Sequence, residues 1–233
     1  FLVVGGEKAK HDSRYIFDEK TDIIKTHALD YDRYLEAEQK NTDFDYLINK
    51  KFAVYLDEGM TDHPDYLHQN IPPYCSADKF FPEINKFFSE FEKKTGLEIV
   101  IASHPRSKFS KDRNPYSDHK IVFGETIELV KRSKLALAHM STSMNYAVFY
   151  NKPIILIDSN HYSQTLRNYI DIWSSKLALE VINISTNWSL HSSSFRSNKE
   201  VYYSYKNDYI KEQSTPEKFV WETFCDYLDK IKI

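Results

Sequence analysis

Glycine is scarce in this sequence, and its scarcity excludes one familiar kind of nucleotide site. The 233 residues include only 5 glycines, and none of them form the spacing G-x-G-x-x-G. That spacing lets the backbone approach the pyrophosphate of a dinucleotide at the start of a helix. We therefore expect no ordinary NAD-binding domain, and any phosphate group must be held by another device.

Cysteines, long apolar runs and an excess of charge are lacking as well. Two cysteines, Cys75 and Cys225, are too few for a disulfide framework and lack metal-ligand spacing, so we expect free thiols in a reducing cytoplasm. The apolar runs fall far short of the ~20 residues that a membrane-spanning helix needs. The net charge of −3 gives no general attraction to nucleic acid, so we expect no nucleic-acid partner.

Short apolar runs alternate with amphipathic segments of helical length from residue 51 onward. The segment 78–94 places apolar residues at helical spacing, and Gly96 follows it as a helix-ending residue. The runs that we predict to be buried strands are 51–56, 98–103, 120–123, 135–139, 153–158 and 178–184. Because alternating strands and helices form parallel sheets, we predict an α/β protein with a Rossmann-like, doubly wound parallel sheet.

The first 48 residues are different in organisation. Residues 1–4 and 22–27 are predicted strands, and 30–39 has helical spacing, which is too little for an independent sheet. We predict that residues 1–48 are the tail of a preceding domain or a linker, and that residues 49–233 form the main domain.

Hydroxyl residues follow the predicted strand 135–139, at the end of the sheet where α/β proteins bind ligands. Ser141, Thr142 and Ser143 open the next helix, so their hydroxyls and the free backbone N–H groups can hold an anion. The alternative is that one of these residues only caps the helix.

A basic turn follows the predicted strand 98–103. His104 can donate a hydrogen bond to a phosphate or protonate a leaving oxygen near neutral pH. Pro105 fixes the turn, and Arg106 can add a bidentate phosphate contact. The alternative is a surface turn with a solvated arginine.

An acidic turn and a long polar loop follow the predicted strand 51–56. The turn is Asp57-Glu58-Gly59, and the loop 60–76 exceeds the usual length of a connection, which favours a functional role. The loop contains Asp62, His63, Asp65 and His68, whose spacing weakly suggests a metal site. A substrate-facing lid is the interpretation that we prefer.

Together these motifs resemble a known family. In chain order they are Asp57-Glu58-Gly59, His104-Pro105-Arg106, Glu125-Thr126 at a helix start, and Ser141-Thr142-Ser143. The series is similar to the nucleotide-binding C-terminal domain of GT-B glycosyltransferases of bacterial surface polysaccharide synthesis. Within these it most resembles the bacterial sialyltransferases and Kdo transferases, which use CMP-sugars and carry a D/E-D/E-G motif, an HP motif and a Ser/Thr motif.

The resemblance implies an inverting, metal-independent transferase that moves a sugar from a CMP-activated donor onto a surface glycan without a cofactor. His104 would assist departure of CMP, and Asp57 or Glu58 would deprotonate the acceptor hydroxyl. Alternatively, Glu58 and Gly59 line the ribose or base pocket. The donor-site residues that it implies are Gly59, His104, Pro105, Arg106, Glu125, Thr126, Ser141, Thr142 and Ser143.

On this interpretation residues 1–48 come from an acceptor-side domain, and residues 49–233 bind the nucleotide-sugar. The expected partners are a nucleotide-sugar donor and a glycan acceptor, and the expected location is cytoplasmic, peripheral to the inner face of the membrane. Other interpretations stay open: a UDP- or GDP-sugar donor, a CDP-polyol transferase, a nucleotide-sugar epimerase of similar architecture, or a non-catalytic α/β binding or interaction domain.

Overall fold

The chain divides into two compact units, one of Phe1–Asp43 with Lys199–Ile233 and one of Phe44–Asn198. The computed structural model describes residues 1–9, 18–40, 50–107, 109 and 113–231. In this division the residues from Lys199 onward, which lie within the predicted main domain of residues 49–233, group with the N-terminal segment.

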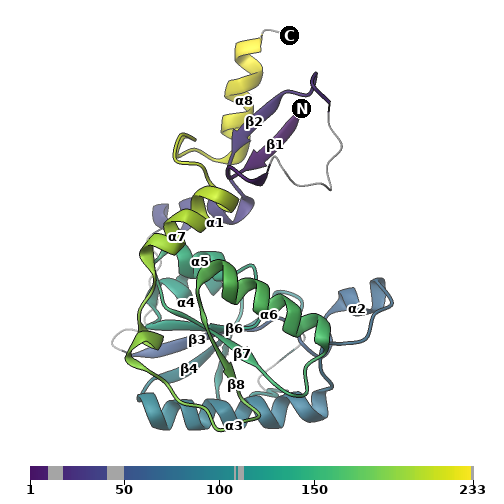
Figure 1. The fold of residues 1–233 in the computed structure, drawn as a ribbon, viewed down its shortest axis with the longest axis vertical. Coiled ribbons are helices and arrows are strands. Elements are labelled where there is room, and N and C mark those ends of the chain that lie inside the picture. Colours follow the sequence, from purple (N-terminus) through teal and green to yellow (C-terminus); the bar gives the residue numbers. More distant parts are fainter. Residues whose placement is uncertain (10–17, 41–49, 108, 110–112, 232–233) are drawn as a thin grey trace. The chain divides into compact units, whose positions relative to one another are not determined.

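A six-stranded parallel sheet forms the larger unit, with strand order β5-β4-β3-β6-β7-β8 (Figure 1). Its strands are β3 (Phe52–Leu56), β4 (Glu98–Ala102), β5 (Lys120–Val122), β6 (Leu135–Ala138), β7 (Ile154–Asp158) and β8 (Glu180–Asn183). The chain runs outward from β3 through β4 to β5, then returns to the other side of β3 at β6. This arrangement confirms the predicted Rossmann-like sheet and places a reversal of strand order beside β3.

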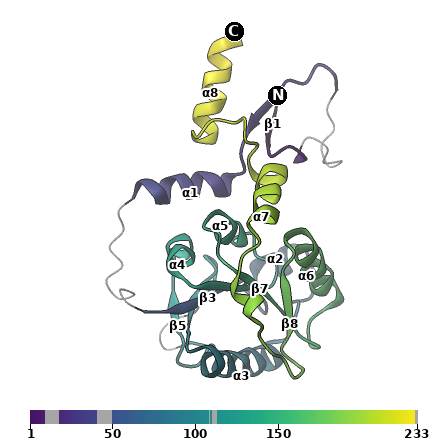
Figure 2. The same cartoon turned by 60° about the vertical axis from the view of Figure 1, so that its left-hand side comes forward.

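Helices cover both faces of this sheet, which explains why its strands are apolar along their length. The helix α3 (Ala77–Thr95) lies on one face, and α4 (Thr126–Arg132), α5 (Met144–Phe149) and α6 (Gln164–Leu177) lie on the other (Figures 1 and 2). Each residue of β3 is buried. The buried residues of α3 are Phe80, Ile84, Phe87, Phe88 and Phe91. They recur at the helical spacing that the sequence predicts for the segment 78–94.

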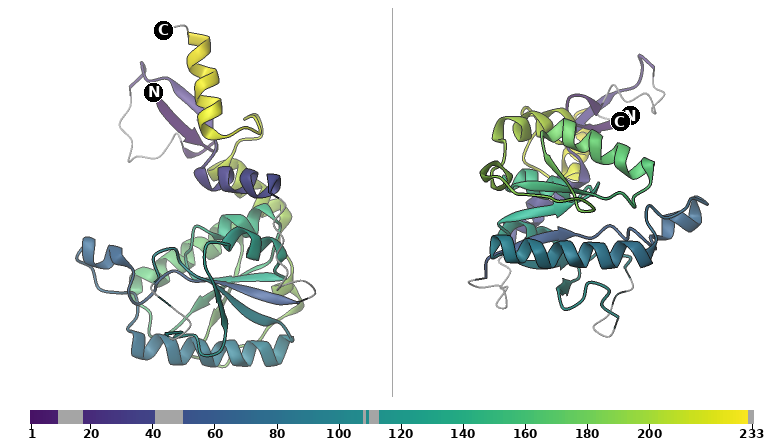
Figure 3. Two further views of the ribbon diagram at one scale, coloured as in Figure 1. Left: turned by 180° about the vertical axis from the view of Figure 1, so that it is seen from behind. Right: turned by 60° about the horizontal axis from the view of Figure 1, so that its bottom comes forward.

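The smaller unit contains a two-stranded parallel sheet of β1 (Leu2–Gly5) and β2 (Ile23–Thr26). Its helices are α1 (Leu29–Gln39), α7 (Lys199–Tyr205), the π-helical turn η4 (Lys206–Ile210) and α8 (Val220–Ile231), which lies alongside the two strands (Figure 3).

Backbone contacts join the two chain segments of the smaller unit. The N–H of Lys8 donates to the carbonyl of Asp208 at 2.8 Å, and the N–H of Val220 donates to the Asp32 carboxylate at 3.0 Å. A Cβ on Gly5 would lie 2.8 Å from the carbonyl oxygen of Ile210, so only glycine fits there. These contacts are the physical reason why the C-terminal residues belong to this unit.

Candidate functional site

The three loops that follow β3, β4 and β6 leave the sheet at neighbouring points of one edge. Leu56 pairs with Ala102 of β4, and Tyr55 pairs with Leu137 of β6. The predicted motifs at residues 57–59, 104–106 and 141–143 therefore lie at the reversal of strand order, where open α/β sheets bind ligands.

Asp57 connects the loops after β3 and β4. Its carboxylate is buried and accepts four hydrogen bonds: Oδ1 from the Gly59 N–H at 3.1 Å and the Tyr116 hydroxyl at 2.8 Å, and Oδ2 from the His104 N–H at 3.1 Å and the Ser107 hydroxyl at 2.8 Å. A carboxylate has about four acceptor sites, so these four donors satisfy it. Asp57 therefore positions the two loops.

Glu58 reaches the loop that follows β6. Its Oε1 accepts from the N–H groups of His139 at 2.9 Å and Met140 at 3.0 Å, and its Oε2 accepts from Met140 at 3.1 Å. Burial raises the pKa of Glu58 to about 7, although these backbone hydrogen bonds favour the ionised form. The residue as a whole is half-buried, and its carboxyl group titrates near neutral pH.

The backbone N–H groups in and just before the predicted Ser141–Ser143 motif are largely engaged within the protein. Those of His139 and Met140 donate to Glu58, and that of Ser143 donates to Ser141 Oγ at 3.2 Å. Ser143 is the N-cap of α5, but its side chain makes no capping hydrogen bond. Thr142, in the middle of this motif, is exposed, and Ser141 and Ser143 are half-buried.

His104 lies against a second histidine from the loop after β3. The ring centroids of His63 and His104 are 4.7 Å apart in an edge-to-face arrangement. Burial, followed by the charge of His63, lowers the pKa of His104, so this imidazole is neutral at neutral pH. Sequence reasoning placed His63 only within a weak metal pattern and missed this contact; the only signal was its place in a long loop.

The helix α2 (Pro64–His68) lies in that loop and is joined to the turn after β4. Arg106 Nη1 lies 2.9 Å from Asp65 Oδ1, in an ion pair whose side chains are 57% and 45% exposed. In the part of the chain that the structure describes, no group of three or more His, Cys, Asp or Glu side chains is placed to hold a metal ion.

Glu125 and Thr126 stand apart from the other predicted residues. They follow the edge strand β5 and begin α4, and β4 separates β5 from β3. Within the described ranges their side chains make no hydrogen bond with His104 or with residues 141–143, and the Glu125 side chain makes no capping bond. The structure does not join them to the site.

His139 directly follows β6 and is fully buried. Its Nδ1 lies 2.9 Å from the carbonyl of Ile157, and its Nε2 lies 3.0 Å from the Tyr55 hydroxyl. Burial lowers the pKa of His139 to about 4. The ring therefore stays neutral and stabilises the sheet beneath the site.

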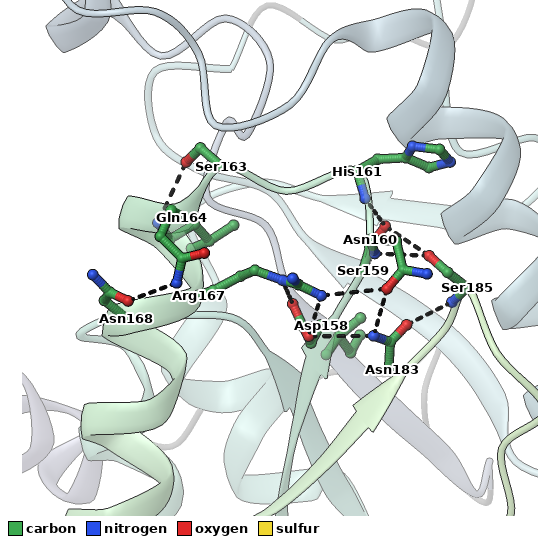
Figure 4. A network of polar contacts seen from close by, with 12 residues as sticks. Asp158, Ser159, Asn160, His161, Ser163, Gln164, Arg167, Asn168, Asn183 and Ser185 are labelled. Atoms are coloured by element: carbon green, nitrogen blue, oxygen red, sulfur yellow. Dashed lines mark hydrogen bonds and ion pairs between the residues drawn. The ribbon is translucent and has the colours of Figure 1, made fainter.

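A second polar network follows β7 and β8 (Figure 4). Arg167 of α6 binds the Asp158 carboxylate through Nε at 3.1 Å and Nη2 at 3.2 Å. The hydroxyls of Ser159 and Ser185 both donate to Glu83 of α3. No local sequence pattern predicts this network, because its members come from three distant segments.

No protein-family model and no curated protein matches this chain. The chain is similar to the structure of UDP-GlcNAc 2-epimerase from Methanocaldococcus jannaschii in complex with UDP-GlcNAc and UDP, with 16% identity, 91% of this chain and 56% of that chain covered, and a TM-score of 0.49. It is also similar to the glycosyltransferase SnogD from Streptomyces nogalater, with 10% identity, 91% and 57% covered, and a TM-score of 0.48.

The chain thus spans little more than half of each of these two structures. Similarity at these sequence identities and TM-scores does not assign an activity to this chain. No helix in the described part of the chain has the length and apolar character needed to cross a bilayer.

Proposed function

We propose that this chain holds the donor site of an inverting glycosyltransferase that uses a nucleotide-activated sugar. The donor that we favour is a CMP-sugar of the sialic acid or Kdo type, and the acceptor is a bacterial surface glycan. One observation carries the proposal: the reversal of strand order brings together a carboxylate (Glu58), an imidazole (His104) and a run of hydroxyls (residues 141–143).

Each of these groups suits one part of the transfer. The acceptor oxygen forms a bond to the anomeric carbon while the bond from that carbon to the donor phosphate breaks, and the hydroxyl proton passes to Glu58. A general base works best when its pKa lies near the working pH, which the value of about 7 for Glu58 satisfies. His104, Arg106 and the hydroxyls of residues 141–143 stabilise the charge that develops on the leaving phosphate.

The proposal includes no cofactor and no metal, since the leaving phosphate is stabilised by N–H and O–H donors and by Arg106. It assigns residues 1–48 to the acceptor side of the enzyme. In support, β1 and β2 form a parallel sheet of only two strands, and Val3 and Ile23 on them are exposed. Parallel strands are normally covered on both faces. It also places the enzyme in the cytoplasm, peripheral to the inner face of the membrane.

Thermal unfolding with CMP, UDP and GDP tests the donor site. A ligand at about 100 times its dissociation constant adds ~2.7 kcal/mol, which corresponds to a Tm increase of about 5–10 °C for a chain of this size. We expect CMP to give the largest shift and His104→Ala to abolish it. No shift with any nucleotide would contradict the proposal.

Analysis of the reaction products distinguishes sugar transfer from the rival activities. Incubation with a CMP-sugar should release CMP and form a glycosidic bond whose anomeric configuration is opposite to that of the donor. Interconversion of a UDP-sugar with its epimer, without transfer, would favour the epimerase interpretation and contradict the proposed one.

A further inference from the structure

We propose that His63 contacts the donor phosphate together with His104, so that the loop carrying α2 forms part of the phosphate site. This inference rests on the proposed function, because it concerns the same edge of the sheet. None of the sequence motifs assigns His63 to the donor phosphate. Three features support it: the turn that places His63, the proton positions on the His63 and His104 rings, and the ion pair between Arg106 and Asp65 beside these rings.

Gly59 turns the chain back toward the site immediately after β3. It has a φ of +61°, a conformation that side chains other than glycine rarely adopt. The carbonyl of Gly59 accepts a hydrogen bond from the His63 N–H at 3.0 Å. This turn brings the His63 ring to the carboxyl end of β4, where it meets His104.

The same local arrangement holds both rings. In each, Nδ1 accepts a hydrogen bond from the backbone N–H two residues further along: from Asp65 to His63 at 3.2 Å, and from Arg106 to His104 at 3.2 Å. A nitrogen that accepts a hydrogen bond carries no proton, so this geometry assigns the ring proton to Nε2 in the neutral tautomer. The pair therefore presents two Nε2–H donors on rings 4.7 Å apart.

Charges of both signs lie around the rings: Arg106 lies beside His104, and Asp65 Oδ2 lies 3.6 Å from His63 Nδ1. Arg106 adds a positive charge beside His104, and its ion pair with Asp65 ties α2 to the turn after β4. The carboxylate of Asp57 is satisfied by four donors and holds the backbone of His104. The His63 side chain is 17% exposed, so a ligand can reach it. A phosphate oxygen is the group that two adjacent N–H donors and an arginine fit best.

The alternative is that His63 only caps α2, through the hydrogen bond from the Asp65 N–H. Two substitutions separate the roles. His63→Asn keeps an acceptor near the position of Nδ1 and removes the Nε2 donor. His63→Gln places an N–H donor near the position of Nε2 and removes the capping acceptor. A ligand role predicts that Asn is the worse replacement for binding, and a capping role predicts that Gln is the worse replacement for stability alone.

The experiment measures CMP affinity by titration calorimetry and Tm for the whole chain and its variants. We expect His63→Asn to weaken CMP binding about tenfold or more with little change in Tm, because it loses one hydrogen bond to a charged group. We expect His63→Gln to bind CMP more tightly than His63→Asn. His68→Asn is the matched control, since His68 lies exposed on the same helix and should bind CMP like the unaltered chain.

Long-range ¹H–¹⁵N spectra test the proton positions without any ligand. The chain has 9 histidines, and His63→Asn and His104→Asn each remove one ring signal, which assigns it. We expect both rings to carry the proton on Nε2. A proton on Nδ1 of His63 would overturn the inference.

CMP binding that His104→Asn weakens but His63→Asn leaves within twofold would also overturn the inference, while the proposed donor site would stand. Failure of the unaltered chain to bind any nucleotide would overturn both.

Discussion

Replacing Asp57 with asparagine should destabilise the sheet unit strongly, because its carboxylate joins two loops through four hydrogen bonds. Each carboxylate oxygen faces one backbone N–H and one hydroxyl. Wherever the new NH2 group of asparagine lies, it meets a backbone N–H of Gly59 or His104 that cannot turn away. One charge-assisted hydrogen bond is lost and the others weaken, for a total of about 4 kcal/mol.

That loss corresponds to a Tm decrease of about 8–16 °C for a chain of this length, measured by circular dichroism at pH 7. Asp62→Asn is the matched control, because Asp62 is an exposed acid on the same loop and should change the free energy of unfolding by less than about 0.5 kcal/mol. The reasoning is refuted if Asp57→Asn unfolds at the same temperature as Asp62→Asn. An Asp57→Asn variant of normal stability that had lost transfer would instead make Asp57 the base.

Glu58→Gln should lower the rate of transfer by about 100-fold or more, since Gln cannot take the proton, while the affinity for CMP is kept. A variant that loses CMP affinity as strongly as it loses transfer rate would contradict the role of Glu58 as base. The rate of the unaltered chain should rise with pH through about 7, where Glu58 ionises, and a rate profile flat from pH 6 to 8 would contradict this. Burial raises the pKa of Glu58 from 4.5 to about 7, so the folded state favours the protonated carboxyl group. The stability that this preference contributes is complete below pH 4.5 and is lost as the pH rises through 7. In thermal unfolding, Glu58→Gln should therefore become more stable relative to the unaltered chain from pH 5 to 8. Tyr55→Phe leaves Nε2 of the buried His139 without its partner and should cost about 1–3 kcal/mol, read as a lower Tm; an unchanged Tm would show that this hydrogen bond contributes nothing.

The sheet and its main helix were predictable from the sequence because their signals are local. A strand covered on both faces must be apolar along its length, and β3 is such a strand. The apolar spacing of α3 likewise follows from the single face that it packs on the sheet. Polar residues at the carboxyl ends of these strands then locate the ligand edge from strand order alone.

What the sequence did not indicate depends on contacts between distant residues. Glu58 accepts the N–H groups of His139 and Met140, more than 80 positions away along the chain. No local pattern shows that these N–H groups are engaged. The return of the C-terminal residues to the N-terminal segment depends on close backbone approaches such as that of Gly5 to Ile210, which hydrophobic periodicity does not report.

The central claim is that the edge formed by the loops after β3, β4 and β6 holds the phosphate of the sugar donor. A crystal structure of the chain with bound CMP tests it most directly. We predict that the phosphate lies within hydrogen-bonding distance of His104 Nε2 and of a hydroxyl among residues 141–143. A nucleotide phosphate bound elsewhere, for example at the Asp158–Arg167 network, would contradict the account.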